Sequence, residues 1–563
     1  MKQKKFSMLP TASVLLVSGG NTQKESKTEI THNQTSNKQA PNNQTSNKQA
    51  PNKQAPNLFL AGEKYAMTHF DPGQSDAFAH NVPRGTFKID LRKFPRIAGG
   101  PVNFMQMIST DPKYMWSTST GGISYVDVSN DGWKPVAQIN TPNLKVIPPE
   151  VLDKGLGQEI RNIKQAENIV LKDWGVNWSR LANNVYMFVD KTNVLYANAQ
   201  PSHVHAYGLK DPKNPAAGIQ ILRTLDFSET LKKVAKGVNN PSLQKYGAPI
   251  IGLSMTYDGQ IIILSPFSVS IIDREFKNKP QTIELPKDEF VSNSVCVDEK
   301  NAIYVASDKM MRKIVWTGKK LSVDEADGAW ASPYDFGEEP PSVKFGTGTG
   351  STPTLMGFGD DPDKLVVITD GANRMNLVAF WRDEIPADFK QQPKTKSRRI
   401  AGQIGITCGL VPLPKFIQSE QSVVVDGYGA FVVNNIRDEG HEDKLVDVLA
   451  GGPVFTPPIG VERCEWDPKT HSWKSVWTRD DVVGTSMVPS MSIPSKIVLV
   501  NGYTLGDGWE LTGMDWNTGE TVTRIIFGQD NLGNGAYALI QFLPNGDLLF
   551  NSIGGPVRVS FKK

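Results

Sequence analysis

The chain repeats one short pattern along most of its length. A strand of small and apolar residues is followed by a tight turn with Asp, Asn, Gly or Pro, and then by a second strand rich in Val, Ile, Leu and Tyr. Two strands joined in this way form a β-hairpin. The turns of successive hairpins lie 40 to 69 residues apart. The six segments that carry the pattern begin at Gly252, Asn293, Thr352, Ser422, Ser486 and Tyr537.

Hairpins that recur at this spacing, with few helical segments between them, are typical of the blades of a β-propeller. Two further turns, in residues 466–473 and 514–522, both place an Asp three residues before a Thr, so a second element repeats with the first. Weaker matches begin at Ile123 and Val185. The sequence therefore predicts an all-β propeller of about seven or eight four-stranded blades over residues 58–563. Its last strand, GPVRVSF, could pair with the first blade and close the ring.

One segment of this region has helical rather than strand periodicity. Its apolar side chains recur on one helical face, at Leu152, Leu156, Ile160, Ile163 and Val170. This spacing predicts a helical insertion near residues 148–175.

The first 57 residues differ from the rest in composition. Residues 1–20 have a basic start, a short apolar run and small residues at the end, which is the order of an export signal. Residues 21–57 repeat NQTSNKQAPN and lack large apolar side chains, so we expect a disordered linker. The expected location is therefore extracytoplasmic, periplasmic or secreted. Gly20 stands where a lipoprotein signal would have Cys, so a lipid anchor is unsupported, and an ordinary disordered start is the alternative.

Net charge and cysteine content further limit the classes of protein to which the chain can belong. The first 57 residues carry +6 of the total net charge of +3, which leaves −3 for the predicted propeller. A slightly acidic propeller lacks the positive electrostatic potential that attracts nucleic acid, so we expect no nucleic-acid partner. We expect no transmembrane segment, because no apolar run is long enough. Cys296, Cys408 and Cys464 are expected to be buried, although an exported chain could pair Cys408 with Cys464.

Two short segments resemble blades of known propeller families. SNSVCVDEKNAIYVAS is similar to a strand pair of calcium-dependent lactonase and esterase propellers (gluconolactonase, paraoxonase and strictosidine-synthase relatives), in which an Asn binds the central cation, and Asn293 matches that Asn. GMDWNTGETVTR resembles the repeat of quinoprotein dehydrogenase-like propellers, but Arg524 stands where that repeat usually has Trp. The first resemblance implies Ca²⁺ on the propeller axis, and the second a quinone cofactor.

Polar residues at strand ends can meet on the axis of a propeller although they are distant in sequence. The candidates are Asn293, Asp370, Asn434 and Asn551. Carboxylate and amide oxygens are the ligands that Ca²⁺ prefers, so these residues predict an axial cation site. The alternative is that they only stabilise turns, as Asn and Asp at strand ends commonly do.

The histidines offer a second candidate site. His203 and His205 are two residues apart on a predicted strand, so their side chains would point the same way, and His69 could join them. These three residues could bind a metal or act as acid and base. Ordinary strand histidines satisfied by backbone groups are the alternative.

The segment GTGTGSTPT, residues 346–354, is rich in Gly and Thr and could contact a ligand through Gly348, Thr349, Ser351 and Thr352. It lacks the Lys of a phosphate-binding loop and is followed by a strand, so it is not a nucleotide signature. A crossing between two blades near the channel mouth is the other interpretation.

The leading functional hypothesis is a cation-dependent hydrolase of small esters or lactones, with Asn293 and Asp370 on the metal and a histidine assisting proton transfer. A non-catalytic scaffold that binds a protein or glycan is the alternative from another class. A quinone-dependent dehydrogenase is the third. Whether the chain is an enzyme at all stays open at this point.

Overall fold

A computed structural model of the 563-residue chain describes residues 53–102, 104–142, 144, 146–177, 183–199 and 202–562. The predicted export signal and all but the last five residues of the predicted linker lie outside the described residues. Of those five, Gln54 and Asn57 donate side-chain hydrogen bonds to the backbone oxygens of Val297 (2.9 Å) and Thr256 (3.0 Å).

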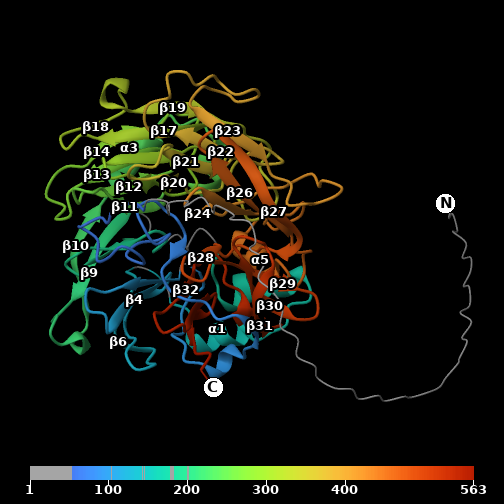
Figure 1. The fold of residues 1–563 in the computed structure, drawn as a ribbon. Helices are drawn as coiled ribbons and strands as arrows, with labels where there is room; N and C mark the ends of the chain where they lie inside the picture. The colour runs from blue at the N-terminus through green and yellow to red at the C-terminus, as the bar shows by residue number, and fades with distance from the viewer. Residues whose placement is uncertain are drawn as a thin grey trace, which may run out of the picture. The chain divides into compact units, whose positions relative to one another are not determined.

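Within the described residues, seven sheets of at least four strands stand around one axis, so the predicted all-β propeller is confirmed (Figure 1). We number these sheets as blades 1 to 7. Blade 1 holds β3 (Met105–Ile108), β4 (Tyr114–Ser119), β5 (Gly122–Asp127) and β6 (Lys134–Asn140). Blade 2 holds β7 (Phe188–Val189), β8 (Leu195–Ala199), β9 (His203–Leu209) and β10 (Ile219–Asp226). Blade 3 holds β11 (Gly252–Met255), β12 (Ile261–Ser265), β13 (Ser268–Ile272) and β14 (Gln281–Glu284).

The remaining blades follow in chain order. Blade 4 holds β15 (Cys296–Val297), β16 (Ala302–Ala306), β17 (Met310–Trp316), β18 (Leu321–Ser322) and β19 (Trp330–Pro333). Blade 5 holds β20 (Thr354–Met356), β21 (Leu365–Thr369), β22 (Asn376–Trp381) and β23 (Ile400–Gly405). Blade 6 holds β24 (Val424–Asp426), β25 (Gly429–Val433), β26 (Ile459–Asp467) and β27 (Ser472–Val483). Blade 7 holds β28 (Ser490–Ser492), β29 (Ile497–Thr504), β30 (Gly508–Asp515) and β31 (Thr521–Gly528).

A three-stranded sheet, called here the closing sheet, fills the gap between blades 7 and 1. It consists of β32 (Ile540–Phe542), β33 (Leu548–Ser552) and β34 (Gly555–Val559). Val488 before blade 7 bridges to Leu539, and Gln106 of blade 1 donates its backbone N–H to Gln541 (3.0 Å). The C-terminal strand does help to close the ring, but it bridges to Arg96, just upstream of blade 1, rather than to a strand of blade 1 itself.

The predicted hairpins form the inner strands of six of the sheets. All six supply the first two strands of blades 3 to 7 and of the closing sheet. Strands such as β12 and β21 are buried at every residue, because neighbouring blades cover both faces of each sheet. Runs of Val, Ile and Leu at these positions therefore fit the interior, and the local pattern was enough to predict them.

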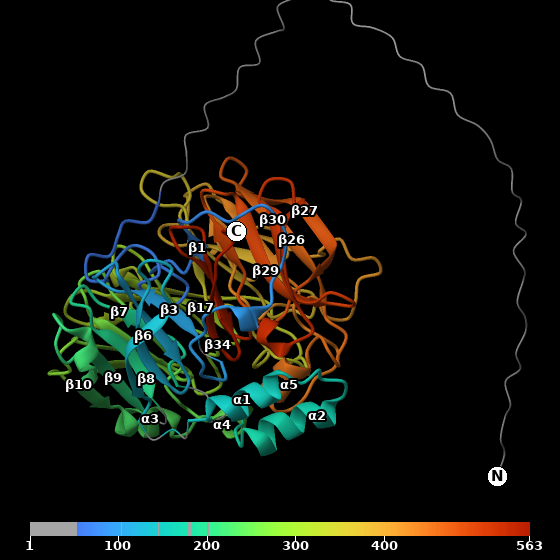
Figure 2. The ribbon, with the colours of Figure 1, turned by 90° about the horizontal axis from the view of Figure 1, so that it is seen from below.

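The helices gather on one side of the ring (Figure 2). The predicted insertion is confirmed as α1 (Pro149–Leu156), α2 (Ile163–Glu167) and a π-helix, η2 (Asn168–Asp173), between blades 1 and 2. Three short helices were not predicted, namely α3 (Ser228–Ala235), α4 (Pro241–Tyr246) and α5 (Lys444–Ala450). Single 3-10 turns are η1 (Leu91–Lys93), η4 (Pro215–Ala217), η5 (Glu325–Asp327) and η6 (Asn531–Gly533). In the part of the chain that the structure describes, no helix is long and apolar enough to cross a membrane.

The channel of the ring is filled by residues 57–82, called here the axial segment. In every sheet, a group of the axial segment is hydrogen-bonded to the innermost strand or to a residue next to that strand. The partners are Ile108, Met187, Thr256, Val297, Leu355, Val425, Met491 and Phe542. Near its end the axial segment includes β1 (Ala77–Phe78), parallel to β28, and the chain after it forms β2 (Gly85–Lys88), parallel to β31. The sequence carried no hairpin pattern here, and the axial segment was not predicted.

Candidate axial active site

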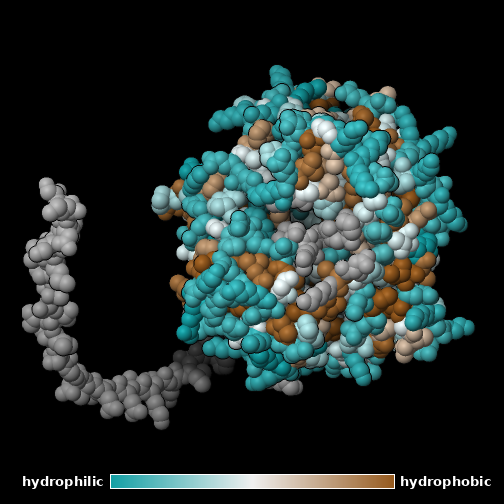
Figure 3. All heavy atoms as spheres, turned by 180° about the vertical axis from the view of Figure 1, so that it is seen from behind, coloured by the Kyte–Doolittle hydropathy of each residue, from teal (hydrophilic) through white to brown (hydrophobic). Residues whose placement is uncertain are grey.

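A cavity of about 860 Å³ lies on the axis, between the axial segment and helices α3 to α5. Residues that lead into the innermost strands form its wall, and His69 belongs to the axial segment at its base. The lining is mostly apolar, with Phe104, Leu231 and Phe290 among its side chains. The face of the molecule opposite to that in Figure 1 carries apolar side chains around its centre (Figure 3). A concave, largely apolar site of this volume suits a small organic ligand.

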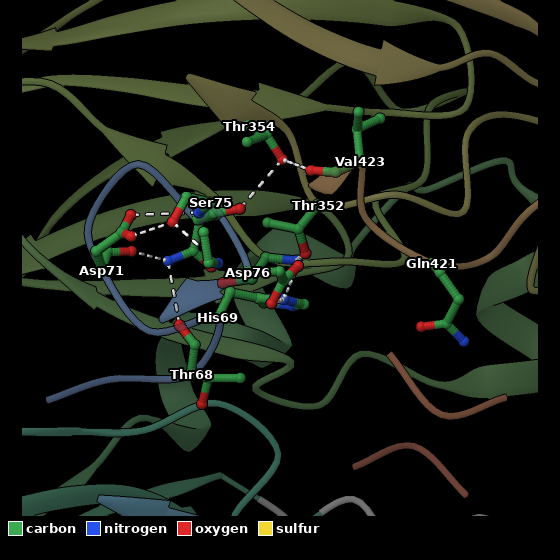
Figure 4. Close-up of polar contacts among 12 residues, drawn as sticks. Thr68, His69, Asp71, Ser75, Asp76, Thr352, Thr354, Gln421 and Val423 are labelled. Atoms are coloured by element: carbon green, nitrogen blue, oxygen red, sulfur yellow. Dashed lines mark hydrogen bonds and ion pairs between the residues drawn. The ribbon is translucent and has the colours of Figure 1, made fainter. Parts of the chain in front are cut away.

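A buried histidine and carboxylate meet at the base of this cavity. The Nδ1 atom of His69 lies 2.8 Å and 2.9 Å from the two carboxylate oxygens of Asp76 (Figure 4). The His69 residue is 3% exposed and Asp76 is fully buried. Among the described residues, no group bonds to the Nε2 atom of His69. When Nδ1 carries the proton that Asp76 accepts, Nε2 is left as a lone-pair base on the cavity side of the pair.

The loop that joins these two residues has an unusual backbone. His69, Phe70, Gln74 and Asp76 all have positive φ, between 52° and 76°. Non-glycine residues rarely adopt this conformation, and such residues cluster at functional sites. Asp71 fixes the loop from inside by accepting hydrogen bonds from the Ser75 N–H (3.2 Å) and the Lys64 ammonium (2.5 Å). The local conformation is therefore held by the loop itself as well as by the blades.

Burial and charge act on Asp76 in opposite directions. Burial raises the pKa of the Asp76 carboxyl, because it penalises the charged form, and His69 lowers that pKa by charge and by hydrogen bonding. The ring of Tyr186 lies 5.7 Å from that of His69, and burial raises the pKa of Tyr186 to about 12. Tyr186 therefore remains a neutral hydrogen-bond donor beside the pair at neutral pH.

A second carboxyl group, Glu420, faces the same cavity from the residues before blade 6. It is half-buried, and its Oε1 accepts a hydrogen bond from Asn435 Nδ2 (3.2 Å). Burial raises the pKa of Glu420 to about 8, against the lowering effect of Lys444. Glu420 is therefore mostly protonated at neutral pH and can donate a proton.

Each of the four predicted cation ligands has hydrogen-bond partners within the protein. Asp370 accepts hydrogen bonds from Ala372 N–H (3.1 Å) and from Asn376 N–H (2.9 Å) and Nδ2 (2.6 Å), so it stabilises a turn after β21. Burial raises the pKa of Asp370 to about 7. Asn434 lies just after β25 and donates to Ile459 O (3.0 Å).

The other two predicted ligands also have protein partners. Asn551, on β33, donates to Leu539 O (2.7 Å) and accepts from Gln106 Nε2 (2.9 Å). Asn293 lines the axial cavity, and its Oδ1 accepts a hydrogen bond from Tyr186 Oη (3.0 Å). Within the described ranges, no group of three or more His, Cys, Asp or Glu residues is placed to hold a metal ion. The calcium hypothesis stays a prediction.

The predicted histidine group is divided between two regions. His203 and His205 lie on β9, the third strand of blade 2, with their rings stacked 6.0 Å apart, whereas His69 is on the axis. His205 Nδ1 lies 2.9 Å from the Thr224 hydroxyl. Burial lowers the pKa of His205 to about 4. The shared direction of the two β9 side chains follows from strand geometry, but His69 does not join them.

The Gly-rich segment crosses from blade 4 to blade 5 beside the cavity. Its backbone passes close to neighbouring chain, since a Cβ atom at Gly348 would lie 2.3 Å from Asp308 Cα. Thr349 N–H donates to Tyr334 Oη (3.1 Å), Ser351 Oγ donates to Gln421 O (2.8 Å), and Thr352 Oγ1 lies 3.3 Å from Tyr186 Oη. Close backbone packing therefore accounts for the glycine at 348, and Thr352 contacts the cavity wall through Tyr186.

Sequence reasoning missed several residues of this cavity. It singled out His69 but not Asp76, although both lie in the same short segment. It also missed Glu420 and Lys344, which look like ordinary surface charges in the sequence. The available signal was the stretch of about 45 residues before the first blade, which has apolar residues but no hairpin pattern. Cys296, Cys408 and Cys464 are buried and free, as expected for small apolar side chains.

The fold and site define a β-propeller protein with a closed axis and an axial cavity. No family model matches the sequence. An uncharacterized protein from Archaeoglobus fulgidus is 33% identical over 325 residues, which are 56% of this chain and 61% of that protein. The match therefore spans less than two thirds of the relative's length.

Three solved structures are among those similar to this chain. The β-propeller domain of Nup133 from Vanderwaltozyma polyspora is 13% identical, with a TM-score of 0.35 over 64% of this chain and 90% of that chain. Virginiamycin B lyase from Staphylococcus aureus is 10% identical, with a TM-score of 0.33 over 66% and 92%. Sqt1 from Saccharomyces cerevisiae is 10% identical, with a TM-score of 0.34 over 65% and 82%.

Proposed function

We propose that this protein is an enzyme that binds a small, largely apolar organic molecule in the axial cavity and acts on it by acid–base catalysis. The observation that carries the proposal is the buried His69–Asp76 pair at the base of the cavity. Hydrolysis of a small ester or lactone is the reaction class that this arrangement fits best. His69 Nε2 takes a proton from a water molecule, and that water attacks the carbonyl carbon.

Glu420 fits the second half of the same reaction. A protonated carboxyl group can donate its proton to the departing alkoxide oxygen, and the proton on His69 can then return to Glu420 through water. Tyr186 and Asn293 form part of the cavity wall, and the Tyr186 hydroxyl holds the Asn293 amide by donating to its Oδ1. Asn293 Nδ2 donates one N–H to Gly350 O and keeps a second that can orient a carbonyl oxygen. The apolar lining reduces the water around these groups, which strengthens their electrostatic effect.

A panel of aryl esters and lactones tests this proposal. Turnover should fall about 100-fold or more in His69→Gln, because a general base contributes on this scale. The matched control is His205→Gln, which removes another buried histidine, away from the cavity. Equal turnover in wild type and His69→Gln would contradict the assignment of His69.

The pH profile tests the role of Glu420. Activity that needs protonated Glu420 should decline above about pH 8, where this carboxyl group ionises. In Glu420→Gln the residual activity should lose that decline, because Gln does not ionise. A decline of unchanged midpoint in the variant would assign it to another group.

The other hypotheses make different predictions for the same purified protein. A non-catalytic scaffold predicts ligand binding without turnover on any ester or lactone. A quinone-dependent dehydrogenase predicts a bound chromophore in the near ultraviolet. The calcium hypothesis predicts that Ca²⁺ raises the melting temperature, because an ion bound only to the folded state stabilises it, and no rise would contradict it. Export stays a prediction, and fractionation of the source cells tests it.

A further inference from the structure

The proposed function leaves one buried group of the cavity without a role. Lys344, in the segment between blades 4 and 5, is 1% exposed and lines the cavity. Its Nζ donates one hydrogen bond, to Gly348 O at 2.7 Å. No carboxylate among the described residues forms an ion pair with it. An ammonium group in such surroundings is costly, because burial removes its hydration and no opposite charge replaces it.

The environment therefore shifts the protonation equilibrium of Lys344 toward the neutral amine. Burial lowers the pKa of Lys344 to about 8, although the more distant carboxylates of Asp370, Glu339 and Glu420 raise it. A lysine with this pKa has an appreciable neutral fraction near pH 7, whereas an ordinary lysine has almost none. Neutral amines are nucleophiles, and a desolvated lysine in an apolar pocket is the usual way for a protein to provide one.

An acid, Glu420, lines the same cavity as this amine. Gly350 packs between the two side-chain positions, since a Cβ atom added there would lie 2.5 Å from Glu420 Cα and 3.0 Å from Lys344 Cγ. Glu420 has a pKa of about 8, so it holds its proton at neutral pH. A nucleophilic amine and a protonated carboxyl group that line one cavity supply the two groups needed to condense an amine with a carbonyl compound.

We propose that Lys344 captures an aldehyde or ketone in the axial cavity as a Schiff base. This inference rests on the cavity being the ligand site, as the proposed function does, but it does not require His69. The nitrogen lone pair attacks the carbonyl carbon and gives a carbinolamine. Glu420 protonates its hydroxyl group, which leaves as water while the C=N bond forms, and the second proton of the nitrogen returns to the Glu420 carboxylate. No electrons are gained or lost, and the products are the imine and one water molecule.

Reductive trapping tests the proposal on the full-length protein. Benzaldehyde is a suitable probe, because it is small, apolar and neutral. With sodium cyanoborohydride as the named reductant, an imine becomes a stable benzylated lysine that peptide mass spectrometry locates. We expect Lys344 to be labelled at least about 10-fold faster than exposed lysines at pH 7, with a rate that rises toward a midpoint near pH 8.

Lys444 provides the matched control. It is also buried, also lines the cavity and also bonds through Nζ to a backbone oxygen, that of Ser342, but Asp447 of its own helix α5 raises its pKa and so partly offsets burial. Lys444→Arg should keep the label on Lys344, whereas Lys344→Arg, which retains the charge but not the nucleophile, should lose it. The melting temperature of each variant shows whether it is folded. Mapping of the wild-type protein gives the answer even if Lys344→Arg does not fold.

The possible outcomes separate this inference from the proposed function. Label on Lys444, or equal labelling of Lys344 and exposed lysines, overturns the Schiff-base inference. Ester or lactone turnover that depends on His69 while Lys344 stays unlabelled leaves the proposed function standing and removes only this inference. Label on Lys344 without any His69-dependent turnover supports the inference and contradicts the proposed function.

Discussion

His69 in the axial segment and His205 in blade 2 are similarly buried, but their surroundings give them different chemistry. His69 is 3% exposed and has both oxygens of Asp76 within 2.9 Å of Nδ1. His205 is 6% exposed and has the Thr224 hydroxyl at the same atom, at 2.9 Å. The hydroxyl offers no charge to support a protonated ring, and burial lowers the pKa of His205 to about 4. His69 is a candidate base because a carboxylate lies at its Nδ1. Burial of the ring, or the spacing of histidines in the sequence, does not by itself make a histidine a base.

The largest expected effect is on turnover in Asp76→Asn. An amide keeps the size of the carboxyl group but cannot stabilise a protonated imidazole, so we expect kcat to fall about 1,000-fold. KM should change much less, because Asp76 is fully buried behind His69. Steady-state kinetics measure both.

Asp71→Asn is the matched control in the same loop. The Asp71 side chain bonds to Lys64 and Ser75 and not to the His69 ring, so its loss should lower stability more than turnover. If Asp71→Asn and Asp76→Asn lower kcat equally while both stay folded, the effect belongs to the loop and not to the pair.

The next largest effect is expected on the stability of the folded state at acidic pH, to which His205 contributes. The folded pKa of about 4 lies below the unfolded value of 6.5, so the folded state binds fewer protons. The contribution of His205 to stability is therefore full above pH 6.5 and is lost as the pH falls to about 4. This contribution is at most ~3 kcal/mol. Melting temperatures of wild type and His205→Gln between pH 7 and pH 4 should converge, and a constant difference would contradict the lowered pKa.

The two regions also differ in how well the sequence predicts them. Blade strands such as β8 and β9 pair with strands that are close to them in the sequence, so the local pattern of apolar strands and turns was sufficient to predict the blades. Local helical periodicity likewise predicted the helical insertion. The axial segment depends on partners far along the chain. Tyr65, for example, bonds to Phe542, which is 477 residues away. No local pattern encodes such contacts.

The candidate site also combines features that the local sequence predicts with features that depend on contacts between distant segments. The scarcity of histidine drew attention to His69, but the left-handed backbone that turns Asp76 back toward it cannot be read from residue types. Lys344 and Glu420 owe their altered pKa values to burial by segments from several blades. The sequence predicted which residue types are available near the axis, and the ring geometry decided which of them meet.

A smaller effect is expected where the axial segment is attached to the ring. Tyr65 Oη donates to Phe542 O (3.3 Å) and accepts from Phe542 N–H (3.2 Å). Tyr65→Phe leaves both backbone groups without this partner in a buried place, which should cost about 1 to 3 kcal/mol. Denaturant unfolding measures the loss. Turnover per folded molecule should persist, because His69 is held by its own loop, and a loss of activity at full folding would show that Tyr65 also positions His69.

The smallest effect is expected for His203→Asn. His203 is half-buried, and its ring stacks on that of His205, 6.0 Å away. The substitution removes this weak ring contact and a weak charge interaction with the exposed Asp226 carboxylate. We expect a stability change within about 0.5 kcal/mol, as for surface substitutions, and turnover within about 2-fold of wild type. Asp226, whose backbone pairs with His203 across blade 2, carries a side-chain charge and can be changed to Asn as a neighbouring control. A fall in turnover of 10-fold or more in His203→Asn alone would contradict the separation of the two histidine regions, because blade 2 would then contribute to the chemistry on the axis.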